Sequence, residues 1–337
     1  MTQKQPGVWT LAWRRFRRDR LGFVSLVVVL LYIGVMLGTA TGLMVPDWQR
    51  EAGVSYAPPT FMGPEAGTAG KDSLAAEVSR PHQDYGIPDP LAADLADIAK
   101  GLTSGGAVEA RAPTLAFGGD KWGRDVIKKA LKGTETSLFV GLAAAALAAF
   151  LGTLFGAQAG YRGGKVDDFF NWLYSVFTSI PYLLLVLAVA AVVNQKGTLT
   201  VILILGLTGW TGIFRLVRAE YIKHKVREYV LAADAVGASD SRRMYVHILP
   251  NVSHVVLVQL SLHVVLFIKS EVILTFLGFG VGVETVSWGS MLAEAGSELL
   301  LGKWWQLTVA TVFMALLVTA FSLFTDAMRD ALDPRLK

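Results

Sequence analysis

The sequence predicts an all-α integral membrane protein with six membrane-spanning helices. Of its 337 residues, 53% are hydrophobic and only 17% are charged, whereas soluble domains carry about 25% charged residues. The mean hydropathy is positive, at +0.47, which is typical of chains that place long apolar segments in a bilayer. The chain has no cysteine, so neither a disulfide framework nor a thiolate metal site is expected.

Six apolar stretches are long enough to cross a bilayer, which requires about 20 residues. They cover residues 21–43, 136–160, 169–193, 198–217, 252–278 and 304–324. The first stretch is too long for the apolar region of a cleaved signal peptide, and no small-residue cleavage site follows it. Three glycines, Gly206, Gly209 and Gly212, interrupt the fourth stretch.

The positive charges predict the orientation of these spans. Five arginines precede the first span: Arg14, Arg15, Arg17, Arg18 and Arg20. With that end in the cytoplasm, the turn at Arg162, the loop 215–243 and the C-terminus are also cytoplasmic, and only Lys196 and Lys303 fall in the two shorter opposite loops. We therefore expect both termini inside, and residues 1–20 to form a basic helix at the headgroup level. A positive-inside anchor with no other role is the alternative interpretation.

The segment 44–117 is predicted to be a long extracytoplasmic loop. It is rich in Pro, Gly, Ala, Ser and Asp, so it cannot bury enough apolar surface for a sizeable core of its own. Leu91, Leu95, Ile98 and Leu102 fall at helical spacing and predict one short amphipathic helix. That helix would cover either the mouth of a pathway or only part of the helix bundle.

Local motifs predict how the next spans begin, pack and bend. Asp125 stands just before a helix-forming run, where the helix dipole favours a carboxylate. Gly152 and Gly156 are four residues apart, which predicts close approach of two helix backbones. Pro181 is expected to kink the third span, because it has no N–H to donate and its ring clashes with the preceding turn.

A charged, helix-forming segment lies between the fourth and fifth spans. Residues 228–251 read EYVLAADAVGASDSRRMYVHILPN. We expect a polar hairpin held at a membrane surface to be a docking site for a partner.

The fifth span contains two charged residues, Lys269 and Glu271. Ionisable residues inside a membrane are costly and suggest a functional site. The favoured alternative is that both lie near the outer surface or pair with a partner chain. Because they are two residues apart on a helix, they point to different faces, and each needs its own partner or water.

Enzyme and nucleic-acid-binding functions have no support in the sequence. Gly164-Lys165 is followed by Val, so no phosphate-binding loop is present, and the common zinc, nucleophile and dinucleotide motifs are absent. The five histidines are scattered, which argues against a metal site. The net charge of +4 is concentrated in short flanks and loops, which indicates membrane orientation and not nucleic-acid binding.

Together these motifs resemble those of the permease subunits of bacterial ABC importers of the dipeptide/oligopeptide/nickel family, in particular the second of the two permeases. In the family's coupling loop, Ala232, Ala233, Gly237, Leu249 and Pro250 match the pattern, whereas Leu231 replaces a Glu and His247 an Ile. In the signature that precedes the family's core domain, Asp120, Gly123, Arg124 and Asp125 match, whereas Gly119 replaces a Thr and Glu135 an Arg. The FLGFG turn at 276–280 and the tail from Asp326 to Arg335 also match.

The resemblance implies a type I importer permease fold. It divides the chain into an interfacial basic helix 1–20, a first span 21–43, an outer loop 44–117, a five-helix core 118–330 with a coupling loop 218–250, and a cytoplasmic tail 331–337. It assigns ATPase coupling, on a helix spanning 228–240, to Glu228, Ala232, Ala233, Gly237, Ala238, Ser239 and Asp240. It gives structural roles to Asp120, Gly123, Arg124, Asp125, Leu249 and Pro250, and leaves Lys269 and Glu271 as pathway or pairing residues.

The implied partners are a second homologous permease, two ABC ATPases that hold ATP and Mg, an extracytoplasmic binding protein, a peptide substrate and membrane lipid. The implied location is the bacterial cytoplasmic (inner) membrane, and the implied mechanism is ATP-driven alternating access without a cofactor on this chain. A nickel chelate, haem or glutathione is the alternative cargo. An ion-coupled secondary transporter is a further alternative; it predicts inverted repeats, which we do not find. The last alternative is a scaffold subunit that transports nothing.

Overall fold

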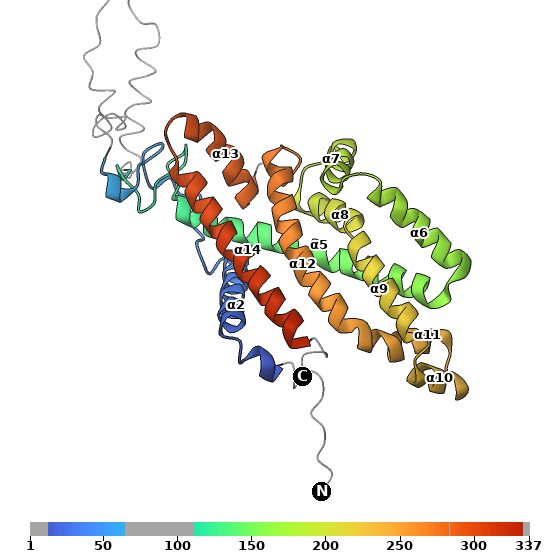
Figure 1. Ribbon diagram of the computed structural model, residues 1–337. Coiled ribbons are helices and arrows are strands. Elements are labelled where there is room, and N and C mark those ends of the chain that lie inside the picture. Colours follow the sequence, from blue (N-terminus) through green and yellow to red (C-terminus); the bar gives the residue numbers. More distant parts are fainter. Residues whose placement is uncertain (1–12, 65–110, 283, 333–337) are drawn as a thin grey trace, which may run out of the picture. The chain divides into compact units, whose positions relative to one another are not determined.

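A computed structural model describes residues 13–64, 111–282 and 284–332 (Figure 1). Contacts divide the chain into a helical unit, Met1–Pro46 with Ala130–Lys337, and a loop unit, Asp47–Lys129. The helix predicted around Leu91–Leu102 and the tail after Leu332 lie outside the described ranges.

Among the described residues, four helices are long and apolar enough to cross a membrane. They are α2 (Arg20–Ala40), α5 (Val126–Arg162), the continuous helix Asp240–Phe276, and α14 (Trp305–Leu332). The first ends three residues before the predicted boundary. Of the predicted basic helix 1–20, the described part is helical at residues 13–16 and at Arg20, where α2 begins, and a turn at residues 17–19 separates the two.

Two further spans are present as bent helix pairs. α6 (Gly164–Thr178) and α7 (Tyr182–Val193) meet at 87°, and Pro181 stands at the start of α7. α8 (Thr198–Thr208) and α9 (Thr211–His224) meet at 41°. The six predicted spans are therefore found within the described residues only when each bent pair counts as one span. The kink predicted at Pro181 is confirmed, and it is large enough to break the third span.

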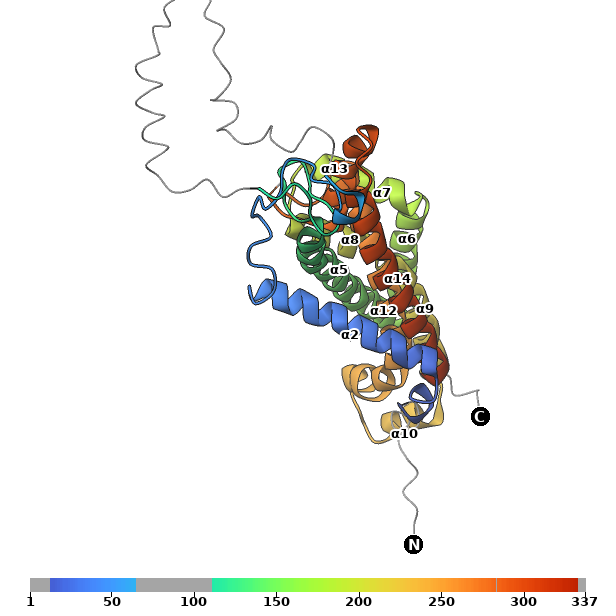
Figure 2. The same ribbon diagram turned by 90° about the vertical axis from the view of Figure 1, so that its left-hand side faces the viewer.

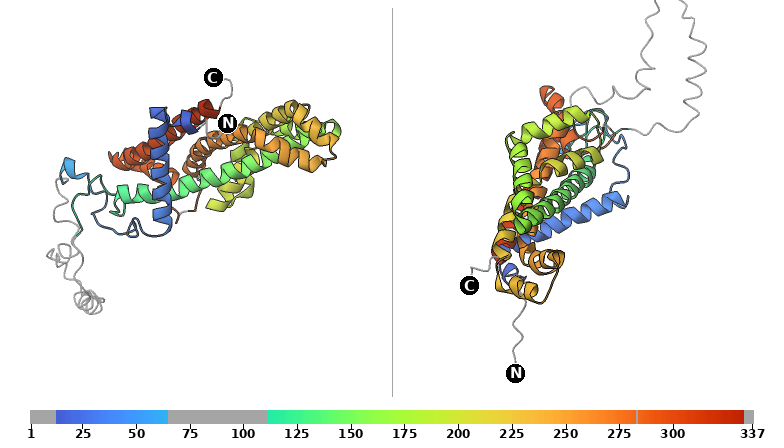
Figure 3. Two further views of the ribbon diagram at one scale, coloured as in Figure 1. Left: turned by 90° about the horizontal axis from the view of Figure 1, so that it is seen from below. Right: turned by 90° about the vertical axis from the view of Figure 1, so that its right-hand side faces the viewer.

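α2 packs against α14 and lies on the outside of the other helices of its unit (Figures 2 and 3). The Tyr32 hydroxyl donates to the Phe313 carbonyl over 2.9 Å. Near the start of α2 the contact is closer, because a Cβ added at Gly22 would lie 2.4 Å from the Ala327 Cβ. The first span is thereby joined to the last.

A row of glycines brings α5 and α9 into backbone contact. A Cβ added at Gly156 would lie 2.9 Å from the Phe214 carbonyl oxygen, and one at Gly160 would lie 2.6 Å from that of Arg218. Gly152 is equally close to α9. These distances are shorter than carbon–oxygen contacts allow, so the packing requires glycine. The close packing predicted for Gly152 and Gly156 is confirmed, and α9 is the partner helix.

An ion pair joins α6 to α9. Arg218 donates from Nε to Asp167 Oδ1 over 2.5 Å and from Nη2 to Oδ2 over 2.6 Å. The Asn171 side chain also donates to Asp167. This two-bond geometry is the strongest form of an Arg–carboxylate contact, and it fixes the first turn of α6 against α9.

The described ends of the loop unit pair with each other. Single bridges link Glu51 to Arg124 and Gly53 to Ala112, and a 3-10 turn, η1 (Thr60–Met62), follows the first strand-like piece. The backbone of Gly123 has φ +78°, and a Cβ there would lie 1.9 Å from the Gly53 carbonyl oxygen. These pieces are therefore more ordered than the irregular loop that the composition predicts.

Candidate functional site

The candidate site is the polar hairpin, which we define as residues 225–248, between α9 and α12 (Leu249–Phe276). It comprises α10 (Glu228–Ala235), the short α11 (Asp240–Arg242) and a π-helix, η2 (Arg243–Ile248). Figure 1 shows the hairpin projecting beyond the ends of α9 and α12. Non-helical backbone is limited to residues 225–227 and 236–239, so the predicted coupling loop 218–250 is largely a continuation of two long helices.

α10 has one packed face and one open face. Val230 and Ala233 are buried, whereas Leu231 and Val236 are 54% and 84% exposed. Glu228 and Ala232 are exposed as well. Apolar side chains left open at the tip of a projecting hairpin favour contact with another protein.

Gly237 ends α10 in a left-handed turn with φ +80°. The Ala238 N–H donates to the Ala233 carbonyl over 3.0 Å, and the Gly237 N–H donates to that of Asp234 over 2.8 Å. This pair of bonds is a Schellman motif, in which glycine is preferred because it has no Cβ to clash. A Cβ added here would meet nothing within 4 Å. Backbone conformation within this chain, and not crowding, is therefore the reason for glycine.

Arg243 fastens α10 to its neighbours. Its guanidinium pairs with Asp234 of α10 and, over 2.5 Å from Nη2 to Oδ1, with Asp240. It also lies over the ring of Tyr161, 5.9 Å from the centroid, at the end of α5. The Tyr161 hydroxyl donates to Asp240 over 3.0 Å. One arginine thus connects the hairpin to α5.

Two further tyrosines hold the base of the hairpin. The buried Tyr221 of α9 donates from its hydroxyl to the Met244 carbonyl over 3.1 Å. The Tyr229 hydroxyl lies 2.8 Å from His224 Nδ1, and partial burial raises the pKa of Tyr229 above its ordinary value. The roles of Tyr161, Tyr221 and Arg243 could not be predicted from the sequence, because they depend on which helices meet.

The predicted coupling residues all lie in the hairpin, but not all in one helix. α10 ends at Ala235, so Gly237, Ala238 and Ser239 form the turn, and Asp240 begins α11. The prediction of a single coupling helix over residues 228–240 is therefore wrong, because the Schellman turn interrupts the helix. The Ser239 hydroxyl caps α11 by accepting from the Arg242 N–H over 3.4 Å.

Leu249 and Pro250 stand where the π-helix passes into α12. The Leu249 N–H bonds to the Met244 carbonyl, five residues earlier. Proline has no N–H and clashes with the preceding turn of an α-helix, and it is located here at the first positions of α12. Single π turns often mark functional sites in helices.

The residues of the N-terminal signature lie together in the loop unit. Asp120 is fully buried, accepts from the Trp122 and Arg124 N–H groups, and pairs with Lys129 Nζ over 2.8 Å. The Asp125 carboxylate accepts from the backbone N–H groups of residues 127 and 128, so it caps α5 as predicted. These contacts fit structural roles, as does the Gly123 turn described above. Elsewhere in this unit, the Lys128 ammonium lowers the pKa of the exposed Asp47 carboxyl.

Glu271 is buried in a hydrogen-bond network inside the helical unit. Its carboxylate accepts from the Ser137 hydroxyl over 2.9 Å and from that of Thr275 over 2.8 Å. Ser137 in turn accepts from the Trp288 N–H at the start of α13 (Trp288–Leu300). Glu271 is 0% exposed and its hydrogen-bond partners are in this chain, so pairing with a partner chain is not what holds it. It stands near the C-terminal end of α12, and its position near the outer surface of the membrane stays a prediction. Lys269 is exposed, so the two residues point to different faces as predicted.

A hollow of about 590 Å³ lies between α5 and the hairpin end of α12. Phe150, Thr153, Tyr245 and Leu257 contribute to its lining. No sequence signal indicated it, because its walls come from helices about 100 residues apart. Among the described residues, no group of three or more His, Asp or Glu side chains is placed to hold a metal ion.

Two protein families match separate stretches of this chain. Residues 152–337 match the family described as binding-protein-dependent transport system inner membrane component. Residues 7–59 match the N-terminal TM domain of oligopeptide transport permease C.

Three relatives illustrate the similarity. The dipeptide transport system permease protein DppC of Bacillus subtilis (strain 168) is 38% identical over 221 residues, which is 66% of this chain and 69% of the relative. The oligopeptide transport system permease protein OppC of the same bacterium is 36% identical over 221 residues, or 66% and 72%. The DppC protein of Lactococcus lactis subsp. cremoris (strain MG1363) is 29% identical over 324 residues, or 96% and 90%.

Proposed function

We propose that this chain, which belongs to the family of binding-protein-dependent transport system inner membrane components, is a permease subunit of an ATP-driven importer of di- and oligopeptides. The names of the relatives support peptides as the cargo. The observation that carries the proposal is the polar hairpin, which exposes apolar side chains at its tip and is fastened at its base to α5 and α9. A chain of this kind transports but does not itself hydrolyse ATP.

The proposed complex contains a second homologous permease, two ATPase subunits and an extracytoplasmic binding protein. The ATPases would hold ATP and Mg and would dock on α10 and the turn that follows it. Glu228, Ala232 and Ala238–Asp240 lie on or beside this surface, whereas Ala233 is buried beneath it. Movement of the ATPases would then tilt α9 and α12 through the hairpin and change which side of the membrane can reach the peptide.

The proposed orientation places the hairpin and both termini in the cytoplasm and the loop unit outside. The arginines before α2 and those of the hairpin support this orientation under the positive-inside rule. The helical unit supports it too, since α2 begins and α14 ends at the same end of the bundle as the hairpin (Figure 2).

Docking on the hairpin is tested by a charge placed at its tip. We expect Val236→Asp to abolish co-purification of the ATPases and ATP-driven peptide uptake, while the permeases still reach the membrane. Leu300→Asp is the matched control, because Leu300 is also apolar and is 89% exposed, at the end of α13. It should retain the ATPases. If Val236→Asp retained the ATPases normally, the hairpin tip would not be part of the docking surface.

The energy source and the cargo are tested in proteoliposomes that contain the whole complex. We expect labelled di- and oligopeptides to be taken up when ATP is present, and uptake to persist when an ionophore collapses ion gradients. Uptake that stops with the ionophore while ATP is plentiful would favour ion coupling instead. Uptake of a nickel chelate but of no peptide would agree with the permease function and contradict the proposal that the cargo is a peptide.

A further inference from the structure

An apolar hollow of about 250 Å³ lies beside the start of α2. Trp13 and Phe16 line it from the helical turn before α2, and Phe324 and Met328 line it from α14. Leu26 of α2 closes a third side. The hollow is thus formed where the first and last spans meet, next to the end of the bundle that carries the hairpin.

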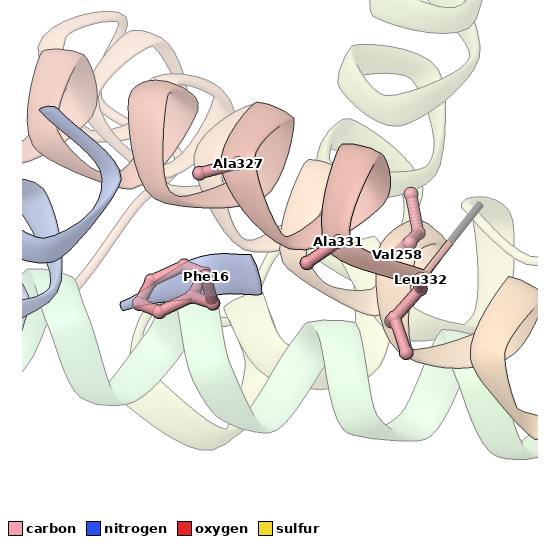
Figure 4. Packing of buried hydrophobic residues seen from close by; sticks show 5 residues of the cluster. All are labelled: Phe16, Val258, Ala327, Ala331 and Leu332. Atoms are coloured by element: carbon pink, nitrogen blue, oxygen red, sulfur yellow. The ribbon is translucent and has the colours of Figure 1, made fainter. Parts of the chain in front are cut away.

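The aromatic side chains give this hollow a fixed wall. Phe16 is only 6% exposed and packs edge-on against Phe324, with ring centroids 5.9 Å apart. Trp13 stacks on Phe16 at 6.0 Å and remains 52% exposed. Figure 4 shows Phe16 across from the small side chains Ala327 and Ala331 of α14. Of these two alanines, Ala331 lines the hollow, and its small side chain leaves space opposite the ring.

Positive charge is concentrated in the segment that lines one side of the hollow. Residues 13–20 contain five arginines and one aspartate, Asp19, whereas residues 324–332 contain Arg329 and two aspartates, Asp326 and Asp330. All five arginines before α2 are exposed, and so is Arg329. Asp19 is already engaged, because its carboxylate accepts from the Leu21 N–H over 3.0 Å at the start of α2. The segment that provides Trp13 and Phe16 to the apolar walls therefore also carries an excess of exposed guanidinium groups.

We propose that this hollow is a binding site for one anionic phospholipid, with an acyl chain between Phe16 and α14 and the phosphate among the arginines. An anionic amphiphile suits both features, since a free anion leaves the apolar walls uncovered and a neutral lipid brings no net negative charge to the arginines. Guanidinium groups bind phosphate with two parallel hydrogen bonds, which suits the exposed arginines. The site would hold the turn before α2 against the end of α14. The lipid site requires only that this chain spans a membrane, whichever cargo it transports.

Trp13 provides the direct test, because bromine atoms on an acyl chain quench indole fluorescence on contact. The whole transporter complex is placed in phosphatidylcholine nanodiscs containing a small fraction of phosphatidylglycerol, with brominated chains on one lipid or the other. The Trp13 signal is the difference between wild type and Trp13→Phe. We expect brominated phosphatidylglycerol to quench it at a much lower mole fraction than brominated phosphatidylcholine.

Variants separate the charge from the hollow. The double variant Arg17→Gln, Arg18→Gln should reduce the preference for phosphatidylglycerol by roughly fivefold per arginine. The double variant Arg17→Lys, Arg18→Lys keeps both charges and should preserve most of that preference. Ala331→Phe should fill the hollow and reduce quenching by both lipids. Leu316→Phe is the matched control, because Leu316 is 56% exposed on the same helix, and it should change nothing.

Two outcomes would overturn the proposal. Equal quenching by the two lipids would show that no anionic headgroup is selected. Absence of Trp13 quenching by either lipid would show that another subunit covers the hollow. The arginine variants change only exposed side chains, so they keep the test valid even if Ala331→Phe does not fold.

Discussion

Replacing Gly237 by alanine should loosen the turn that ends α10. The left-handed backbone at this position, φ +80°, costs an L-residue about 1–2 kcal/mol. No steric cost adds to this, because a Cβ would meet nothing within 4 Å. The opening equilibrium of the turn should therefore shift by roughly 5- to 30-fold.

Hydrogen exchange measures this shift in the assembled complex. The Gly237 and Ala238 amides close the turn, so both should exchange faster by about that factor in Gly237→Ala. Gly237→Asn should lose less protection, because asparagine tolerates the left-handed region. Gly302→Ala is the matched control: it also has positive φ, at +77°, and open space around it, but it lies at the end of α13. Unchanged protection of the hairpin amides in Gly237→Ala would refute the conformational explanation.

The same position separates conformation from docking. Gly237→Arg carries the same backbone cost as Gly237→Ala, and the rest of its side chain extends into open space. Any additional loss of ATPase binding in the arginine variant therefore reports contact with the partner. Equal ATPase retention by the two variants would exclude docking at Gly237.

Helix contacts and surface charges can be tested by single substitutions. Gly156→Ala should lower the stability of the detergent-solubilised chain by about 1–3 kcal/mol, since its Cβ would collide with α9; Gly296→Ala, a helical glycine with open space around it, should leave the melting temperature unchanged, and equal effects would contradict the packing argument. Ser137→Ala should cost about 1–3 kcal/mol, because Glu271 and the Trp288 N–H each lose a buried partner; a neutral result would show that water replaces the hydroxyl. A membrane-impermeant maleimide should label Lys196→Cys but not Ser239→Cys in intact cells, and the reverse pattern would invert the topology.

Features set by local chemistry could be predicted from the sequence. The break at Pro181 follows from a missing N–H, the cap at Asp125 from the exposed amides of a helix start, and the close approach at Gly152 and Gly156 from the absence of Cβ atoms. Each depends on a few neighbouring residues. The number of spans was predictable for the same reason, since hydropathy is summed along one stretch of chain.

Features set by distant partners could not be predicted. Glu271 bonds to Ser137, 134 residues away, and a charged residue near the end of a span gives no sign of such a partner. From the sequence alone, Arg243 is equally compatible with a solvent-exposed charge in a basic loop. The extent of α10 was missed because Gly237 can follow a helix or stand within one, and only the two turn bonds decide between these cases.

The contacts of the polar hairpin favour a stiff connection between its tip and the membrane helices. Asp240 is held by Tyr161 at the end of α5, Asp234 is held by Arg243, and Met244 is held by Tyr221 of α9. α5 and α9 are themselves in backbone contact along the glycine row, so they cannot slide apart without losing that packing. A push on α10 should therefore reach α5, α9 and α12 together, and the tip should not swing by itself. The Gly237 turn is one of only two non-helical links within the described hairpin, which is why loosening it should weaken transport more than ATPase binding.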